Sequence, residues 1–199
     1  MQLALKEIDL KTSWIRSGNK SFIYKEVIDS TLNIALNEDN QKKYIGKIVI
    51  SDKQLKGKGT YNKSWYSEPY KDLTFSIILG SENNFQQNLI DDSCEAIVNV
   101  LKKRNIKAYQ KKPNDIYVNN KKIAGILLSN VQTKIGYPYQ ALSIGININS
   151  NFDLKKIDKN AKVKNTSFLK ELQIETKREV ILVEILESID IVIQKLVNQ

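Results

Sequence analysis

The sequence lacks histidine entirely and contains a single cysteine, Cys94, among its 199 residues. Without histidine, the chain cannot form a Ser-His-Asp or Cys-His catalytic group, and it lacks the commonest metal ligand. A single cysteine excludes an intramolecular disulfide and a cysteine-rich zinc site. We therefore expect no metal held by the protein itself. Any catalysis must depend on lysine, carboxylates, backbone amides or a bound metal–nucleotide complex.

Glycine, proline and long apolar runs are also scarce. Eight glycines and three prolines are too few for long coil linkers. The longest apolar runs, such as 123–128, are far too short to span a bilayer. No basic segment leads into an apolar stretch at the N-terminus, so no signal peptide is predicted. These absences predict a cytoplasmic protein that does not bind membranes.

Positive charge is in excess, because 31 lysines and arginines outnumber 22 carboxylates and give a net charge of +9. Such a surface is typical of proteins that bind nucleic acids, phosphates or acidic partners, but also of a merely solvated, lysine-rich exterior. A nucleic-acid-binding module is therefore one alternative. The lysines are dispersed, however, and no recognition helix or aromatic RNA-binding motif is present, so we expect no specific DNA binding.

The composition, with 41% hydrophobic and 27% charged residues, is typical of a globular protein. The length fits one domain, residues 1–199, with a core over about 22–150 and a C-terminal helical segment over about 160–197. Apolar and β-branched runs predict strands at 22–28, 44–50, 73–79, 107–109, 116–118, 123–128 and 139–148. Apolar residues at helical spacing predict helices at 32–36, 85–101, 166–172 and 179–197. This order predicts an α+β fold in which helices cover a mixed, mostly antiparallel sheet.

Three local features refine this prediction. Cys94 lies on the apolar stripe of the helix expected at 85–101, so we interpret it as a core residue and not as a reactive thiol. Asn119 and Asn120, between two expected strands, predict a tight hairpin turn. Residues 51–64 lack hydrophobic periodicity and predict a basic, flexible loop.

Three segments carry polar residues that a plain structural domain does not require. The first, 54–65, places Gly57 and Gly59 among lysines, so that backbone amides and positive charge can approach an anion. The second joins Lys-Lys-Pro-Asn-Asp at 111–115 to Lys-Ile-Ala-Gly-Ile-Leu at 122–127. The third, 143–149, sets glycine and asparagine inside an apolar strand, where glycine permits close approach and a buried amide needs a partner.

Each segment also has a purely structural explanation. A loop of glycine and lysine is often a solvated turn. The second segment is compatible with a β-hairpin entered through a proline turn. The asparagine of the third segment is compatible with a core amide whose partner lies in the protein. Taken one at a time, the residues leave both explanations open.

Together, and in this order, the segments resemble the catalytic domain of biotin–protein ligases. The pieces that match the motifs of that family begin at Asp29, Gln54, Lys111, Lys122 and Gly145, and the resemblance covers roughly 22–196. It implies a fold similar to the catalytic core of class II aminoacyl-tRNA synthetases and biotin ligases. It also implies an enzyme that forms biotinyl-5'-AMP from biotin and ATP with Mg²⁺. The biotin would then pass to a lysine of a biotin carrier protein, such as the carrier of acetyl-CoA carboxylase.

The resemblance implies roles for individual residues. Lys111 would lie beside the biotin carboxylate and the α-phosphate, and Lys58 would help to stabilise the charge that builds there. Asp115 would orient or deprotonate the acceptor amine, unless it is only a turn residue. The implied biotin-binding residues are Ser30, Thr31, Gln54, Gly57, Lys58, Gly59, Thr60, Lys111 and Gly125. The implied nucleotide-binding residues are Lys58, Lys63, Trp65, Asn114 and Asn147, with Trp65 packed on the adenine.

The chain departs from the family pattern at several positions. Leu32 stands where the family has asparagine, and Lys58 and Thr60 stand where it has arginines. Lysine keeps the charge of arginine but loses its bidentate fork, and threonine keeps neither. Lys112 replaces a tryptophan. Two alternatives therefore stay open: a lipoate–protein ligase, and a divergent, low-activity member that binds biotin or its adenylate.

The ends of the sequence add an expectation about domains. Only 28 residues precede Asp29, so we expect no N-terminal helix-turn-helix domain of the kind that bifunctional members carry. The chain stops just after its last expected helix, so the C-terminal SH3-like domain of most members is also not expected. The sequence leaves both a monomer and a homodimer open.

Overall fold

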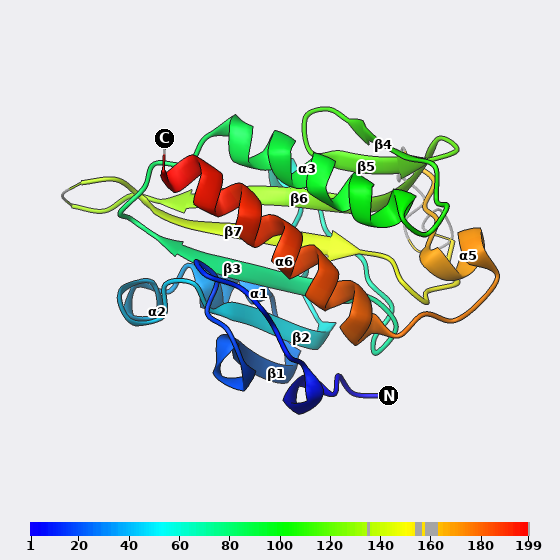
Figure 1. Cartoon of the computed structure of the whole chain (residues 1–199), viewed down its shortest axis with the longest axis horizontal. Coiled ribbons are helices and arrows are strands. Elements are labelled where there is room, and N and C mark those ends of the chain that lie inside the picture. Colours follow the sequence, from blue (N-terminus) through cyan, green and yellow to red (C-terminus); the bar gives the residue numbers. More distant parts are fainter. Residues whose placement is uncertain (135, 154–156, 158–162, 199) are drawn as a thin grey trace.

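A computed structural model describes residues 1–134, 136–153, 157 and 163–198. In this part of the chain, seven strands form one sheet in the order β1-β2-β3-β7-β6-β5-β4 (Figure 1). The strands are β1 Phe22–Ile28, β2 Ile48–Gln54, β3 Leu73–Gly80, β4 Ala108–Lys111, β5 Asp115–Val118, β6 Lys121–Val131 and β7 Tyr139–Ile146. Strands β1 and β2 pair in parallel and the other neighbours pair antiparallel. The predicted α+β class is confirmed.

Helices cover both faces of the sheet. The two long helices, α3 and α6, pack against each other and lie across one face (Figure 1). The short helices α1 and α2 contact β3 and β7 on the other side. The helices are α1 Thr31–Ala35, α2 Glu38–Lys43, α3 Gln87–Lys102, α5 Phe168–Leu172 and α6 Arg178–Val197, with 3₁₀ turns at Leu5–Glu7, Asn19–Ser21 and Thr60–Asn62. No helix among the described residues has the length and apolarity needed to cross a bilayer.

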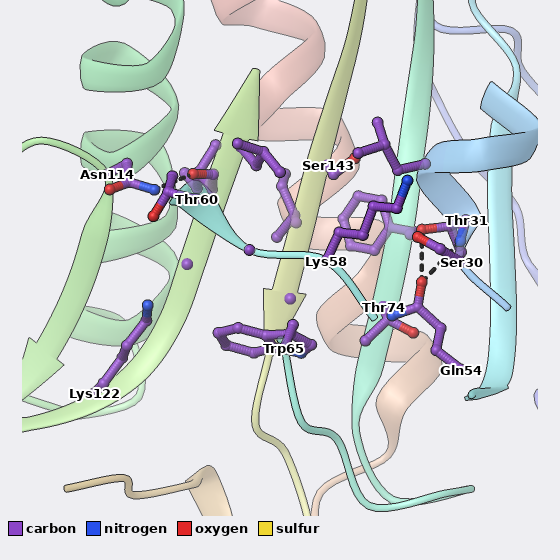
Figure 2. A pocket seen from close by; sticks show the side chains of 18 residues that line it. Ser30, Thr31, Gln54, Lys58, Thr60, Trp65, Thr74, Asn114, Lys122 and Ser143 are labelled. Atoms are coloured by element: carbon purple, nitrogen blue, oxygen red, sulfur yellow. Dashed lines mark hydrogen bonds between the residues drawn. The ribbon is translucent and has the colours of Figure 1, made fainter. Parts of the chain in front are cut away.

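The two faces of the sheet differ because successive side chains of a strand point to opposite sides. In β3, Leu73, Phe75 and Ile77 enter the large core beneath α3 and α6. Thr74 lines a cavity on the other face (Figure 2), and the Ser76 hydroxyl contacts Thr31 there. A small apolar cluster covers only part of that face. The large core also contains Cys94, and burial raises the pKa of its thiol to about 12. The prediction that Cys94 is a core residue is confirmed.

The main error of the sequence prediction lies around residues 37–54. We expected a strand at 44–50, but the strand β2 begins at Ile48 and continues to Gln54. The preceding residues form α2, which the Asn37 side chain caps by accepting a hydrogen bond from the Asn40 N–H. Tyr44 ends that helix, and Gly46 turns the chain with φ 78°. The start of the expected C-terminal helical segment, 160–162, lies outside the described residues.

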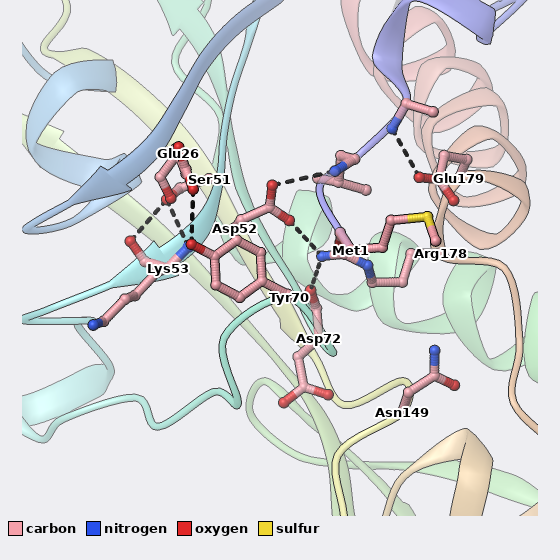
Figure 3. Close-up of polar contacts among 12 residues, drawn as sticks. Met1, Glu26, Ser51, Asp52, Lys53, Tyr70, Asp72, Asn149, Arg178 and Glu179 are labelled. Atoms are coloured by element: carbon pink, nitrogen blue, oxygen red, sulfur yellow. Dashed lines mark hydrogen bonds and ion pairs between the residues drawn. The ribbon is translucent and has the colours of Figure 1, made fainter.

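The N-terminal segment is fixed to the sheet and to α6 by a buried ion pair (Figure 3). An Arg178 guanidinium N–H donates to Asp52 at 2.7 Å, and both side chains are almost fully buried. Arg178 also donates to the Met1 carbonyl, and the Tyr24 hydroxyl donates to Asp52. Hydrogen bonding to Asp52 joins burial, the larger cause, in raising the pKa of Tyr24. The pair therefore links the chain terminus, β1, β2 and α6.

Replacing Arg178 with methionine should destabilise the fold strongly. The change leaves the Asp52 carboxylate buried without its cation, which costs about 3–5 kcal/mol. Urea unfolding followed by circular dichroism measures the loss. Lys42→Met is the matched control, because Lys42 forms an exposed ion pair with Glu38 and its loss should leave the midpoint unchanged. Equal midpoints for the wild type and Arg178→Met would contradict the assigned role.

Candidate functional site

A narrow cavity of about 50 Å³ lies on the face of the sheet opposite α3 and α6. With the Trp65 indole in place it is smaller than the usual small-molecule site, which has several hundred Å³ (roughly 300–1,000). Strands β3, β7 and β6 form the floor, and the chain that follows β2 folds over it (Figure 2). The lining residues are Ser30, Thr31, Leu32, Gln54, Lys58, Gly59, Thr60, Trp65, Thr74, Phe75, Asn114, Lys122, Gly125, Ile126, Leu127, Ser143, Ile144 and Gly145.

The floor is open because small residues meet across neighbouring strands. Thr74 of β3 pairs with Gly145 of β7, which in turn pairs with Gly125 of β6. The adjacent row contains Ser76 and Ser143 in the same register. Glycine inside a strand leaves room for close approach of a ligand or another group. The sequence therefore forms a shallow polar trough in the middle of an otherwise apolar sheet.

The glycine-rich segment forms a short hairpin above this floor. The Gly59 N–H donates to the Lys63 carbonyl at 2.8 Å, and the Trp65 N–H donates to the Gly57 carbonyl at 2.9 Å. Tyr61 turns the tip with φ 54°. A side chain at Gly57 would place its β-carbon 2.5 Å from the Trp65 carbonyl oxygen, so the stem requires glycine there. The expected loop is thus present from Leu55 onward, although its first residues belong to β2.

The indole of Trp65 lies directly on the two glycines of the floor. A β-carbon at Gly145 would overlap the indole ring, and one at Gly125 would lie 3.2 Å from it. The indole Nε1 is buried and has no hydrogen-bond partner in the described part of the chain. Trp65 therefore separates the cavity into two ends (Figure 2).

One end carries hydroxyl and amide groups, from Ser30, Thr31 and Gln54 (Figure 2). The carbonyl oxygen of the Gln54 side chain accepts from the Thr31 backbone N–H at 2.8 Å and from its hydroxyl at 3.1 Å. Strand β2 continues beside β1 to Gln54, which places this amide at the first turn of α1. The arrangement provides several hydrogen-bonding groups for a polar ring.

The other end carries Lys122 and Asn114, close to Thr60 of the hairpin (Figure 2). Lys122 Nζ forms an ion pair with Asp115 at 2.6 Å and lies 5.3 Å from the centre of the Trp65 ring. The Asn114 amide donates to the Ile126 carbonyl. This end therefore offers positive charge to an anionic ligand.

A β-bulge places Lys122 in the cavity. Tyr117 pairs with Lys122 but Ile116 pairs with Ala124, so Ile123 is an extra residue in β6. Ile123 and Ala124 both enter the core, and the Lys122 side chain lies over Gly125. Bulges reorient side chains in this way because they interrupt the alternation of a strand.

Most of the predicted site residues meet in the cavity. Those that line it are Ser30, Thr31, Gln54, Lys58, Gly59, Thr60, Trp65, Asn114 and Gly125. Two others contact a lining residue without lining the cavity: Gly57 in the hairpin stem and Asp115 through Lys122.

Lys111, Lys63 and Asn147 lie elsewhere. Lys111 is on the edge strand β4, and its Nζ lies 4.6 Å from the centre of the Tyr117 ring. Lys63 is exposed on the hairpin. Asn147 is buried just beyond the end of β7, where its amide donates to the Thr166 carbonyl, although its Oδ1 has no partner in the described residues. Lys111 therefore does not line the cavity that Lys58 of the hairpin enters.

Sequence reasoning missed three lining residues with chemical potential: Lys122, Thr74 and Ser143. Lys122 belongs to a motif that was recognised, but a bulge leaves no signature in a single sequence. Thr74 and Ser143 stand at alternating positions among apolar residues of β3 and β7, and this alternation was the available signal.

Asp72 anchors the chain between the hairpin and β3. Its carboxylate accepts from the backbone N–H groups of Glu68, Ile148 and Ser150. Burial raises the pKa of Asp72 from 3.8 to about 6, although these donors oppose the shift. Asp72 thus ties the segment after Trp65 to the segment after β7.

Comparisons with known proteins agree on one family. The model of the biotin/lipoate A/B protein ligase family matches residues 24–149. The bifunctional ligase/repressor BirA of Bacillus spizizenii is 30% identical over 161 residues, which are 76% of this chain and 50% of that protein. Biotin–protein ligase 2 of Arabidopsis thaliana is 31% identical over 113 residues, 53% of this chain and 33% of that protein. The chain therefore spans half or less of the length of these curated relatives.

Solved structures share the fold. A biotin protein ligase from Aquifex aeolicus in complex with biotin and ATP has a TM-score of 0.70 at 24% identity, over 88% of this chain and 71% of that one. The biotin acetyl coenzyme A carboxylase synthetase from Helicobacter pylori, with bound biotinylated ATP, has a TM-score of 0.61 at 20% identity, over 87% of this chain and 78% of that one. At these identities the likeness establishes the architecture alone.

The pKa of Asp72 predicts a pH-dependent stability. The folded carboxyl takes up a proton near pH 6 and the unfolded one near 3.8, so its contribution to the free energy of unfolding grows as the pH falls between them. From pH 7 to pH 5 the gain is about 1 kcal/mol. Urea unfolding of the wild type and Asp72→Asn at both pH values measures it. An equal difference between the two proteins at pH 7 and pH 5 would exclude this linkage.

Replacing Gly145 with alanine should expel the indole of Trp65 from the floor, because the new methyl group overlaps the ring. In a Trp14→Phe background Trp65 is the only tryptophan, and its fluorescence should shift to longer wavelength. Ser129→Ala is the control for a small change outside the site, because Ser129 lies on the neighbouring strand β6 and does not line the cavity. An unchanged emission spectrum in Gly145→Ala would refute the stacking.

Proposed function

The chain belongs to the biotin/lipoate A/B protein ligase family, and from that premise we propose that it is a biotin–protein ligase. In this proposal it joins the biotin carboxylate to AMP from ATP and transfers the biotinyl group to a lysine of a biotin carrier protein. One observation carries the proposal. A glycine–lysine hairpin, residues 57–65, covers a cavity that has one end with hydroxyl and amide groups and one end with lysine.

The two ends suit the two parts of the acid substrate. The bicyclic ring of biotin contains a cyclic urea, which needs both donors and acceptors, and Ser30, Thr31 and Gln54 provide them. The carboxylate would extend past Trp65 to the end that carries Lys122. Lys58 enters the cavity from the hairpin and adds a second ammonium group. The nucleotide would then lie between the hairpin and Asn114.

The first step needs electrostatic stabilisation and the exclusion of water. A carboxylate oxygen of biotin attacks the α-phosphorus of ATP, a P–O bond forms, and pyrophosphate leaves with the electrons of the broken bond. Negative charge grows on the phosphate oxygens, and Lys122 and Lys58 would stabilise it. The hairpin that covers the site would protect the mixed anhydride from hydrolysis.

In the second step the neutral amine of the carrier lysine attacks the acyl carbon. A C–N bond forms, the C–O bond to AMP breaks, AMP leaves with the electrons of that bond, and the amine proton passes to solvent. Asp115 pairs with Lys122 and does not line the cavity, so we assign it to the positioning of Lys122. This replaces the direct role toward the amine that the resemblance implied.

Mg²⁺ would accompany the nucleotide. Among the described residues no three histidine, cysteine or carboxylate side chains cluster to hold an ion. This fits an ion bound mainly by the phosphates of ATP and by water, as is common for Mg²⁺. It would neutralise part of the charge on those phosphates.

The role proposed for Lys122 predicts different effects for two lysine variants. Lys122→Gln should lower biotin-dependent adenylate formation by about 100-fold or more, because a charge directed at the reacting phosphate is lost. Lys111→Gln should retain most activity, because Lys111 lies against Tyr117 at the sheet edge. Pyrophosphate release with biotin, ATP and Mg²⁺ measures both, and thermal unfolding checks that both variants fold.

The reverse pattern, with Lys111 essential and Lys122 dispensable, would refute the geometric assignment. Wild-type protein that releases no pyrophosphate with biotin but does so with lipoate would instead make the chain a lipoate–protein ligase. Mass spectrometry of a biotin carrier domain after incubation tests the transfer step, with a gain of one biotinyl group expected.

A further inference from the structure

A continuous row of hydroxyl groups crosses the floor of the cavity. The Ser143 and Ser76 hydroxyl oxygens are 2.7 Å apart, and the Ser76 hydroxyl donates to the Thr31 hydroxyl at 2.8 Å. The Thr31 hydroxyl in turn lies 3.1 Å from the side-chain oxygen of Gln54. These four residues come from β7, β3, α1 and β2. The row therefore joins four elements that are distant in sequence.

The direction of every proton in this row is determined. The Gln54 oxygen accepts from the Thr31 backbone N–H, which fixes the orientation of the amide. Each hydroxyl has one proton to donate. Thr31 uses its proton for Gln54 and Ser76 uses its proton for Thr31, so Ser143 must donate to Ser76.

Because Ser143 donates its proton to Ser76, its oxygen can only accept a hydrogen bond from a group in the cavity. Its neighbours Leu142 and Ile144 enter the core on the other face, and Ser143 lines the cavity beside Leu127 and near Leu32. Its proton points inward to Ser76, so the lone pairs of its oxygen remain for a ligand. The Gln54 amide nitrogen, at the other end of the row, has no partner in the described residues and can donate.

From this arrangement we propose that Ser143 determines which acid the enzyme accepts. Its oxygen accepts a hydrogen bond from a ring N–H of the substrate, and the Gln54 amide donates to the adjacent carbonyl. A cyclic urea has this combination of groups, whereas the dithiolane ring of lipoate has neither. The inference rests on the proposed function and specifies how that site selects its acid.

Isothermal titration calorimetry with biotin tests the proposal on the full chain. Ser143→Ala should weaken biotin binding about tenfold, the effect of one hydrogen bond to a buried site. Ser143→Thr keeps the hydroxyl and should remain within about threefold of the wild type. Ser129→Ala is the matched control, because Ser129 is a partly buried serine of the adjacent strand β6 that does not line the cavity. It should bind biotin like the wild type.

Two further ligands identify the contact. Desthiobiotin keeps the cyclic urea and lacks the sulfur ring, so Ser143→Ala should weaken its binding by the same factor. Lipoate binding should not weaken in that variant. In steady-state assays the variant should raise the KM for biotin and leave kcat close to the wild-type value, because the contact is far from the reacting carboxylate.

Different results overturn different statements. If Ser143→Ala binds biotin as the wild type does, or loses affinity for biotin but not for desthiobiotin, the role of Ser143 is wrong and the proposed function stands. Equal weakening for lipoate would also exclude the N–H contact. If the wild type binds no biotin at all, the proposed function itself fails.

Discussion

The site depends on one geometric constraint, the absence of β-carbons where β6 and β7 cross the middle of the sheet. Gly125 and Gly145 are cross-strand neighbours, and the Trp65 indole lies on both. The opposite face of the same strands is packed with isoleucine and leucine beneath α3 and α6, so the floor cannot move away to create space. Room for a ligand therefore comes only from the small residues of the exposed face and from the position of the hairpin above them.

Elements with a strong local signal were predicted well from the sequence. Strand β1, helix α3 and the turn at Asn119 and Asn120 are confirmed, and both asparagines have the positive φ that such a turn requires. The boundaries of β2 were not predicted, because Lys53 and Gln54 look like loop residues and extend as a strand only beside β1. Pairing with a distant segment overrides the local preference in this case. Helix α2 was missed for the same kind of reason, since its sequence is almost entirely polar and it packs through little more than Gln41.

The cavity was predicted in outline, but Lys122, which lines it, was not among the predicted site residues. The order of the motifs indicated which segments meet: four of them lie at the end of a strand or in the loop after it, and the motif at 122–127 lies in the first half of β6. Whether a lysine enters the cavity depends on the face of the sheet to which its side chain points. For Lys122 that face is set by a single inserted residue, Ile123, whereas Lys111 lies against Tyr117. Strict alternation would place Lys122 on the core face, opposite Gly125. The alternation of side chains along a strand therefore predicts the wrong face for Lys122. The correct face follows only from the register between β5 and β6.

The position of Trp65 links the cavity to the chemistry proposed for it. Partial burial of the Trp65 side chain on the glycine floor contributes at most about 2–3 kcal/mol, whereas leaving its Nε1 buried without a partner costs about 1–3 kcal/mol. The two terms nearly cancel, so the hairpin is held over the floor by little net energy from its largest side chain. A ligand that satisfies Nε1, or that replaces the indole above Gly145, needs to overcome only a small difference. The unpaired indole nitrogen thus makes the closed hairpin easier to reopen, as the proposed entry of biotin and ATP and the release of a product would need.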